Sequence, residues 1–174
     1  MMMGMLKAGG LDLLVDDERA PDDHNPRGYF EYQPVKSLAR GMPAPWLSRA
    51  QGMALKVVSR LLFELPPEYR YEVIFMRRPV AEILASQSQM MHSAGHPIDD
   101  KEDARLAHIF SDHLVEVDSW IANRANLRSL NVTYAEVIEQ PRVQAERVVG
   151  FLDLPLEPEK MVTAVVAELH RQRL

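Results

Sequence analysis

Two adjacent arginines and a serine have the types and the spacing to bind an anionic group. Arg77 and Arg78 follow an apolar run, residues 71–76, and precede a proline suited to the first position of a helix. A buried parallel strand that passes into a helix presents backbone amides and the positive helix end, and arginine matches phosphate or sulfate oxygens. Ser86 lies two turns into the expected helix, on the face of its start. The segment predicts an anion site, and the alternative is that the arginines are solvated or pair with an acid such as Glu82.

Lys56 is a second residue in an unusual setting. It lies within the apolar run 53–58, where a lysine is unusual unless its ammonium reaches solvent or has a function. Both interpretations stay open. His92 and His96 have the i, i+4 spacing of two metal ligands on a helix, but Gly95 interrupts that helix and no third ligand is evident. We therefore expect no metal site.

The elements that would position these residues alternate between strands and helices. Strands are expected at residues 53–58, 71–76 and 127–134. Helices are expected at residues 1–8, 31–40, 61–65, 80–91, 101–124, 142–152 and 157–169. This order, without hairpin signals or repeats, predicts one α/β domain over residues 1–174, with three layers and a mostly parallel sheet. Such sheets bind ligands at the carboxyl ends of their strands, where Arg77 and Arg78 lie.

Composition limits the classes of function. The chain has 174 residues, of which 47 % are hydrophobic and 26 % charged, as in an ordinary globular protein. It has no cysteine, which excludes disulfides, thiol catalysis and cysteine-bound metals. The net charge of −5 does not favour nucleic-acid binding, and the sequence has no apolar run of the roughly 18 residues that a membrane span needs. We expect a cytoplasmic protein.

Residues 75–86 resemble the 3′-phosphate-binding segment of the sulfotransferases that use 3′-phosphoadenosine-5′-phosphosulfate (PAPS). In that family a strand is followed by an arginine and, eight residues later, by a serine, which is the spacing of Arg78 and Ser86. Family members often carry Asn or Asp directly after the arginine, where this chain has Pro79. The choice between Arg77 and Arg78 therefore stays open.

The resemblance extends over most of the chain. Residues 25–31, NPRGYFE, are similar to an Asn-Pro-Lys-Gly-Tyr-Phe-Glu segment of bacterial sulfotransferase-like proteins. Residues 56–66 and 134–152 are similar to segments that flank the 3′-phosphate-binding segment in the family. The resemblance implies the sulfotransferase variant of the P-loop nucleoside triphosphate hydrolase fold.

Roles for the candidate residues follow from the resemblance. Arg78, Ser86 and the neighbouring arginine would bind the 3′-phosphate of PAPS, and Lys56 would lie near the transferred sulfuryl group. Val58 stands where some members have a catalytic histidine, so that role does not carry over. Glu31 is the candidate base, by similarity to members that use a glutamate. The alternative for Glu31 is a solvated residue at a helix start, where a carboxylate favours the helix dipole.

The start of the sequence departs from the family. Residues 1–8 resemble the helix that follows the family's first strand and phosphate-binding loop, so we expect a sulfotransferase fold that is truncated at its N-terminus. Either the recorded start is internal to a longer protein, or the chain has lost the loop. The implied function is sulfuryl transfer from PAPS to a hydroxyl or amine of a small molecule, glycan or peptide. The alternative is a non-catalytic binding module, so activity, acceptor and oligomeric state stay open.

Overall fold

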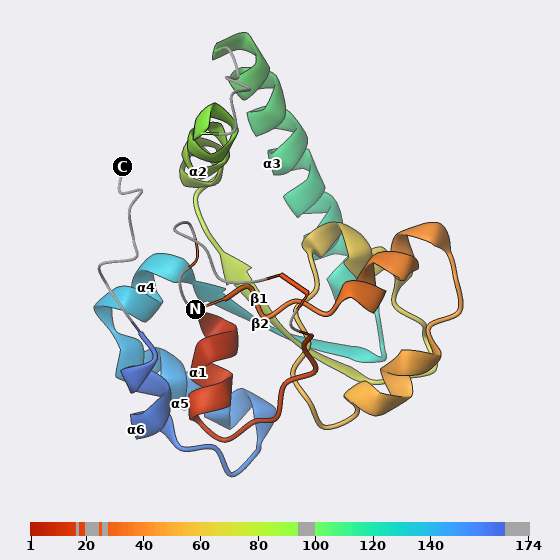
Figure 1. Cartoon of the computed structure of the whole chain (residues 1–174), viewed down its shortest axis with the longest axis vertical. Coiled ribbons are helices and arrows are strands. Elements are labelled where there is room, and N and C mark those ends of the chain that lie inside the picture. Colours follow the sequence, from red (N-terminus) through yellow and green to blue (C-terminus); the bar gives the residue numbers. More distant parts are fainter. Residues whose placement is uncertain (17, 20–24, 26–27, 94–99, 166–174) are drawn as a thin grey trace.

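The computed structural model of the chain describes residues 1–16, 18–19, 25, 28–93 and 100–165, and it has helices packed around a pair of strands (Figure 1). The α-helices are α1 (Met2–Ala8), α2 (Val80–Ser93), α3 (Asp100–Ala122), α4 (Tyr134–Glu139), α5 (Pro141–Leu152) and α6 (Pro158–Thr163). The strands are β1 (Tyr71–Arg77) and β2 (Leu127–Thr133). The 3-10 helices are η1 (Gln33–Arg40), η2 (Pro45–Ala50) and η3 (Ser59–Glu64).

The sheet is parallel, as predicted, but smaller than predicted. β1 and β2 pair from Tyr71 opposite Leu127 to Arg77 opposite Thr133, so both of these predicted strands are confirmed. The predicted strand at residues 53–58 is wrong, because only Ala54 pairs, in an isolated parallel bridge with Leu13. A run of β-forming residues becomes a strand only where a neighbouring segment runs alongside it, and here one bridge is all that forms.

The helices also differ from expectation in kind and length. The predicted helices at 31–40 and 61–65 are the 3-10 helices η1 and η3. η1 has a proline in its first turn and ends at Arg40, because the following Gly41 has a positive φ of 61° that stops the helix. The last predicted helix, 157–169, is α6, which ends at Thr163, and residues 166–174 lie outside the described residues.

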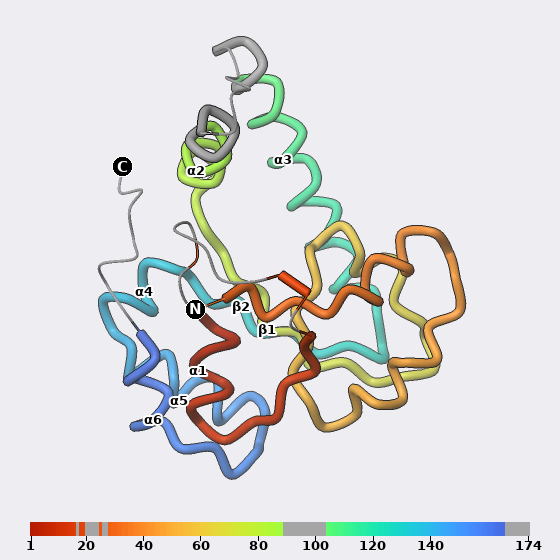
Figure 2. The backbone as a smooth tube through the Cα atoms, viewed as in Figure 1, coloured from red at the N-terminus to blue at the C-terminus, as the bar shows by residue number. Residues whose placement is uncertain are grey.

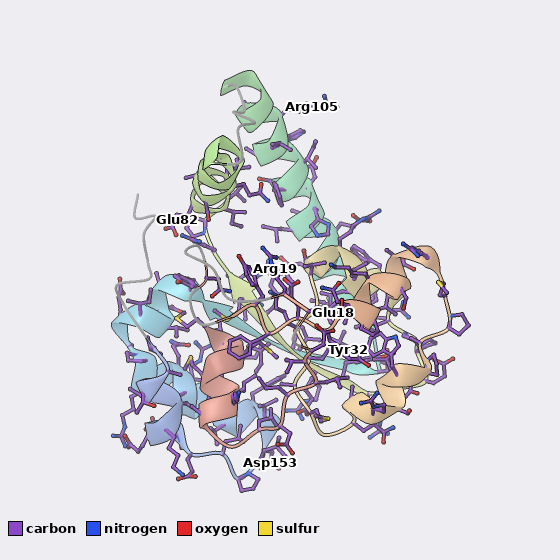
Figure 3. All side chains as sticks on the ribbon, in the orientation of Figure 1. Glu18, Arg19, Tyr32, Glu82, Arg105 and Asp153 are labelled. Atoms are coloured by element: carbon purple, nitrogen blue, oxygen red, sulfur yellow. The ribbon has the colours of Figure 1, made fainter. Side chains whose placement is uncertain are left out.

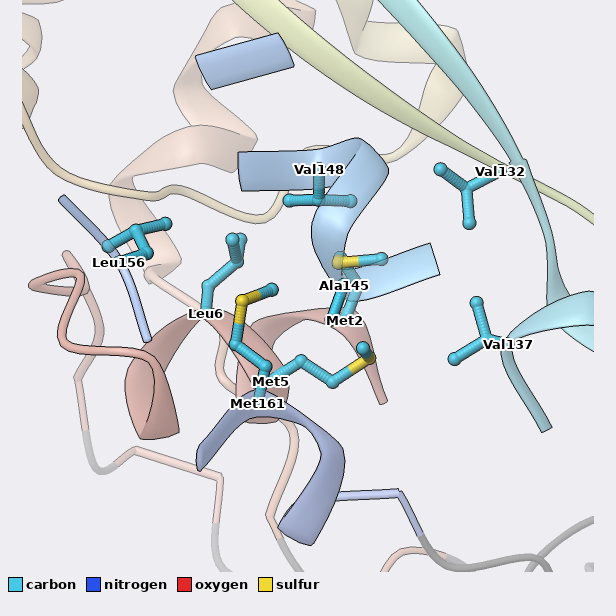
Figure 4. Packing of buried hydrophobic residues seen from close by; sticks show 9 residues of the cluster. All are labelled: Met2, Met5, Leu6, Val132, Val137, Ala145, Val148, Leu156 and Met161. Atoms are coloured by element: carbon cyan, nitrogen blue, oxygen red, sulfur yellow. The ribbon is translucent and has the colours of Figure 1, made fainter. Parts of the chain in front are cut away.

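Two hydrophobic cores pack against the sheet. The first core consists of Met2, Met5, Leu6, Val132, Val137, Ala145, Val148, Leu156 and Met161 (Figure 4). The second core consists of Val35, Leu38, Leu61, Leu62, Leu65, Phe75 and Val117. Figure 2 shows how the first core forms, since α1 lies beside α6, which packs on α5, although α1 and α6 come from opposite ends of the sequence.

β1 contributes alternate residues to the two cores. Ile74 and Met76 pack against the first core, whereas Val73 and Phe75 belong to the second. Successive side chains of a strand point to opposite faces of a sheet, so the two cores lie on opposite faces of β1. This α/β arrangement is compatible with the predicted three layers, and the full parallel sheet of a P-loop fold remains a prediction.

Candidate functional site

Arg77, the last residue of β1, is held by β2 and α3. Its Nε donates to Asn131 Oδ1 at 2.8 Å, and its guanidinium forms an ion pair with Asp118 of α3. The guanidinium carbon also lies 4.2 Å from the centroid of the Phe75 ring. The structure therefore fixes the orientation of Arg77 through contacts with three elements.

Arg78, the next residue, contacts α2 and α4 instead. Its Nε donates to Glu82 Oε2 at 2.8 Å, and its guanidinium carbon lies 5.0 Å from the Tyr134 ring centroid. Glu82 is buried on the turn of α2 nearest β1 (Figure 3). The pairing with Glu82 that the sequence left as the alternative is thus present. Ser86 lies one turn further along α2, so Arg78 contacts the face of α2 that carries this serine.

Tyr134 adds a neutral hydroxyl to the Arg78 environment. Burial raises the pKa of Tyr134 above its usual value because it disfavours the phenolate. Arg78 lowers this pKa, and Glu82 raises it, by smaller amounts than burial. The phenol is therefore protonated at neutral pH and able to donate a hydrogen bond.

Lys56 and Glu31 lie together, although 25 positions separate them in the sequence. Lys56 Nζ lies 3.2 Å from Glu31 Oε1 and donates to the carbonyl oxygen of Tyr29 at 2.9 Å. Arg19 Nη1 lies 3.4 Å from the same Glu31 oxygen, and its guanidinium carbon lies 3.3 Å from the Tyr29 ring centroid. We call Arg19, Tyr29, Glu31 and Lys56 the lysine cluster. In it the two candidate catalytic residues, Lys56 and Glu31, are in direct contact.

The backbone around Phe30 holds the lysine cluster together. Phe30 has a φ of 50°, a left-handed conformation that is rare for a bulky residue and occurs at functional sites. Because Tyr29 and Glu31 flank Phe30, this turn directs the carbonyl of one and the carboxylate of the other toward Lys56. Asp16 anchors the turn, since its backbone amide donates to Glu31 O at 2.9 Å and its carboxylate accepts from the Gln33 amide at 2.5 Å.

Sequence patterns did not reveal several residues that contact the candidate site residues. Arg19 is in a polar segment without a motif, and Asp118 lies 41 positions from its partner Arg77. Another such contact joins Ser59 Oγ and His113 Nε2 at 2.8 Å, across 54 positions. Such contacts depend on tertiary packing, so neither residue type nor spacing indicates them.

A comparison with known protein families finds a match to the part of the chain that contains most of the candidate site residues. The model described as sulfotransferase family matches residues 38–158 of this chain. The chain belongs to the sulfotransferase family. Lys56, Arg77, Arg78 and Ser86 all lie within the matched region of this sulfotransferase-family chain, and Glu31 precedes it. Neither the curated proteins nor the solved structures contain a match to the chain.

The cationic side chains of these two environments all form ion pairs with carboxylates. Four cationic side chains face three carboxylates in the ion pairs of Arg19 and Lys56 with Glu31, of Arg77 with Asp118 and of Arg78 with Glu82. Among the described residues, no three His, Cys, Asp or Glu side chains are placed to hold a metal ion. No helix in the described part of the chain has the length and hydropathy to cross a membrane.

Proposed function

We propose that this sulfotransferase-family chain transfers a sulfuryl group from PAPS to a hydroxyl or amine acceptor. The observation that carries the proposal is the position of Arg78, at the end of β1 and against the face of α2 that bears Ser86. In this proposal Arg78, the Ser86 hydroxyl and the first amides of α2 bind the 3′-phosphate of the donor. Arg77 is the alternative arginine for that role.

The lysine cluster would act on the transferred group. Sulfuryl transfer, like phosphoryl transfer, depends on positioning and on neutralising charge as the bond to the leaving oxygen breaks. Lys56 would stabilise the charge that develops on the leaving phosphate oxygen. Glu31 would fix the lysine through their 3.2 Å contact, or accept the proton of the acceptor. The acceptor would be selected by residues 16–30 and 93–101, of which 17, 20–24, 26–27 and 94–99 lie outside the described residues.

The binding of 3′-phosphoadenosine-5′-phosphate (PAP), the product that carries the 3′-phosphate, tests the donor site. We expect the Arg78→Ala variant to bind PAP about 10- to 100-fold more weakly, the effect of losing about 1.5–3 kcal/mol from charge-assisted contacts. Ser86→Ala should weaken binding less, because its hydroxyl is neutral. Isothermal titration calorimetry measures both affinities.

Two variants separate binding from folding in this experiment. Arg78→Ala also removes a cationic partner of Glu82, so the double variant Arg78→Ala/Glu82→Gln shows the loss of affinity when both charges of the pair are removed. Arg128→Ala removes an arginine at the other end of the sheet, where it pairs with Glu72, and should leave the affinity unchanged. Equal affinities of wild type and Arg78→Ala would contradict the proposed 3′-phosphate site.

The proposal includes the predicted strand and phosphate-binding loop upstream of α1. Its support is an edge of β1 that has no paired strand in the described part of the chain. PAP affinity that rises when the residues encoded in frame upstream are added would support this part of the proposal. The alternative function, a binding module, differs in one result: the chain would bind PAP but release no PAP from PAPS in the presence of an acceptor.

A further inference from the structure

A hydroxyl and an imidazole form a contact that the functions proposed above do not use. Ser59, the first residue of η3, has its Oγ at 2.8 Å from Nε2 of His113 on α3. Both side chains are partly buried, and the Phe63 ring packs edge-on against the imidazole with the ring centroids 5.9 Å apart. The imidazole is thereby held in one orientation by a packed ring and a hydrogen bond.

This pair lies on segments that also carry residues of both groups, since Lys56 precedes Ser59 and Asp118 follows His113. Lys56 precedes Ser59 by three residues of extended chain, which is about 10 Å at roughly 3.3 Å per residue. On α3, His113 precedes Asp118, the partner of Arg77, by five residues, which is about 7.5 Å at roughly 1.5 Å per residue. The backbone of Ser59 therefore lies within about 10 Å of the backbone of Lys56, and the backbone of His113 lies within about 10 Å of that of Asp118.

His113 also continues a core-facing stripe of α3 outward. His113, Val117 and Trp120 have i, i+4 and i+7 spacing, and Val117 is fully buried in the second core. The packed side chains of Val117 and Trp120 therefore support the imidazole at the outer end of this stripe.

We propose that Ser59 and His113 accept the proton of the acceptor, a role that rests on the sulfuryl transfer proposed above. The acceptor oxygen or nitrogen attacks the sulfur of PAPS, and the bond from sulfur to the bridging phosphate oxygen breaks, which releases PAP. The acceptor proton passes to Ser59 Oγ while the hydroxyl proton of Ser59 passes to His113 Nε2, in its neutral tautomer with a free Nε2 lone pair. Glu31 then serves to position Lys56, consistent with its contacts to two cations.

The test follows PAP release from PAPS with 2-naphthol as the hydroxyl acceptor and, in a second series, with water alone. His113→Asn should lower the turnover about 100-fold or more, the scale of general base catalysis, and leave PAP affinity unchanged. Ser59→Ala should also lower turnover without changing PAP affinity. In His113→Gly, added imidazole should restore part of the rate, which a purely structural histidine would not allow.

His108→Asn is the matched control on the same helix. His108 is an exposed residue of α3 whose only recorded partner in the described residues is Asp112, so its replacement should leave turnover unchanged. Thermal melting shows whether each variant folds, and Ser59→Ala carries the test if the His113 variants do not. Full turnover by His113→Asn or Ser59→Ala would overturn this inference alone. A wild type that binds PAP but releases none from PAPS would overturn it together with sulfuryl transfer, and a wild type that does not bind PAP would overturn the donor site as well.

Discussion

At the scale of single residues, the site cations are balanced by carboxylates of the same chain. Arg78 pairs with the buried Glu82, and Lys56 pairs with Glu31, so these two positive charges are compensated within the chain. Such pairs let a chain place cations at a partly buried site, because a buried charge without a partner is costly. An anionic donor would then add to contacts that already orient the guanidinium and the ammonium.

Tyr134 provides a spectroscopic probe of the proposed 3′-phosphate site. Its pKa is raised above the usual value of 10.0, so we expect its phenolate to appear above pH 10. PAP bound at Arg78 would offset the arginine charge that lowers this pKa, so PAP should raise the pKa further. Ultraviolet absorbance at alkaline pH measures the ionisation, and Tyr134→Phe identifies the contribution of this residue. A titration of Tyr134 that PAP leaves unchanged or moves downward would contradict binding next to Arg78.

The raised pKa of Tyr134 also makes the stability of the folded chain depend on pH. The folded chain holds the Tyr134 proton at pH values where the unfolded chain releases it, so the contribution of Tyr134 to stability is complete below pH 10. It decreases as the pH rises through the folded-state pKa. Tyr134→Phe should remove this part of the alkaline loss of stability, which urea unfolding at increasing pH measures.

At the scale of elements, local patterns predicted β1 and β2 but not the contacts that join elements. The apolar run before Arg77 pairs along its length with β2, so its strand propensity is realised. Residues 53–58 have a similar propensity but pair only at Ala54. The contact of Lys56 with Glu31 depends on the left-handed turn at Phe30, and no residue pattern predicts that an aromatic residue adopts it.

The pairing of β1 predicts an alternating pattern of amide exchange. The Tyr71 amide donates to Asn126 O, so the amides of Val73 and Phe75 also point toward β2. The amides of Ile74 and Met76 point to the edge of β1 that has no paired strand in the described residues. We expect these two to exchange faster than Val73 and Phe75 in hydrogen exchange followed by NMR. Equal protection of all four amides would show that another strand covers the edge.

At the scale of the whole molecule, β1 connects two cores that no other strand joins in the described chain. Phe75 is buried in the second core, and its neighbour Met76 packs against the first. Loss of either core would expose one face of a two-stranded sheet, and so small a sheet is not stable without packing on it. We therefore expect the two cores to unfold in one cooperative transition.

The positions of the two tryptophans allow a direct test of this coupling. Trp46 and Trp120 both pack against the second core, so tryptophan fluorescence reports that core, whereas far-ultraviolet circular dichroism reports all helices. Val148→Ala changes only the first core, where Val148 is fully buried, and should cost about 2 kcal/mol. If the cores unfold together, this variant shifts the fluorescence transition in urea as far as the dichroism transition, although Val148 is in the core without tryptophans.

Val117→Ala is the reciprocal variant, and alanine variants of Val143 and Val115 are the controls. Val117→Ala in the second core should shift both signals by a similar amount, because Val117 is also fully buried. Val143 on α5 and Val115 on α3 are exposed residues of the same two helices, so their alanine variants should shift neither transition. A fluorescence transition that stays in place while Val148→Ala moves the dichroism transition would mean that the cores unfold separately. In that case β1 would not couple them, and Arg78, at the end of β1, would lose its fixed position relative to the first core before the second core unfolds.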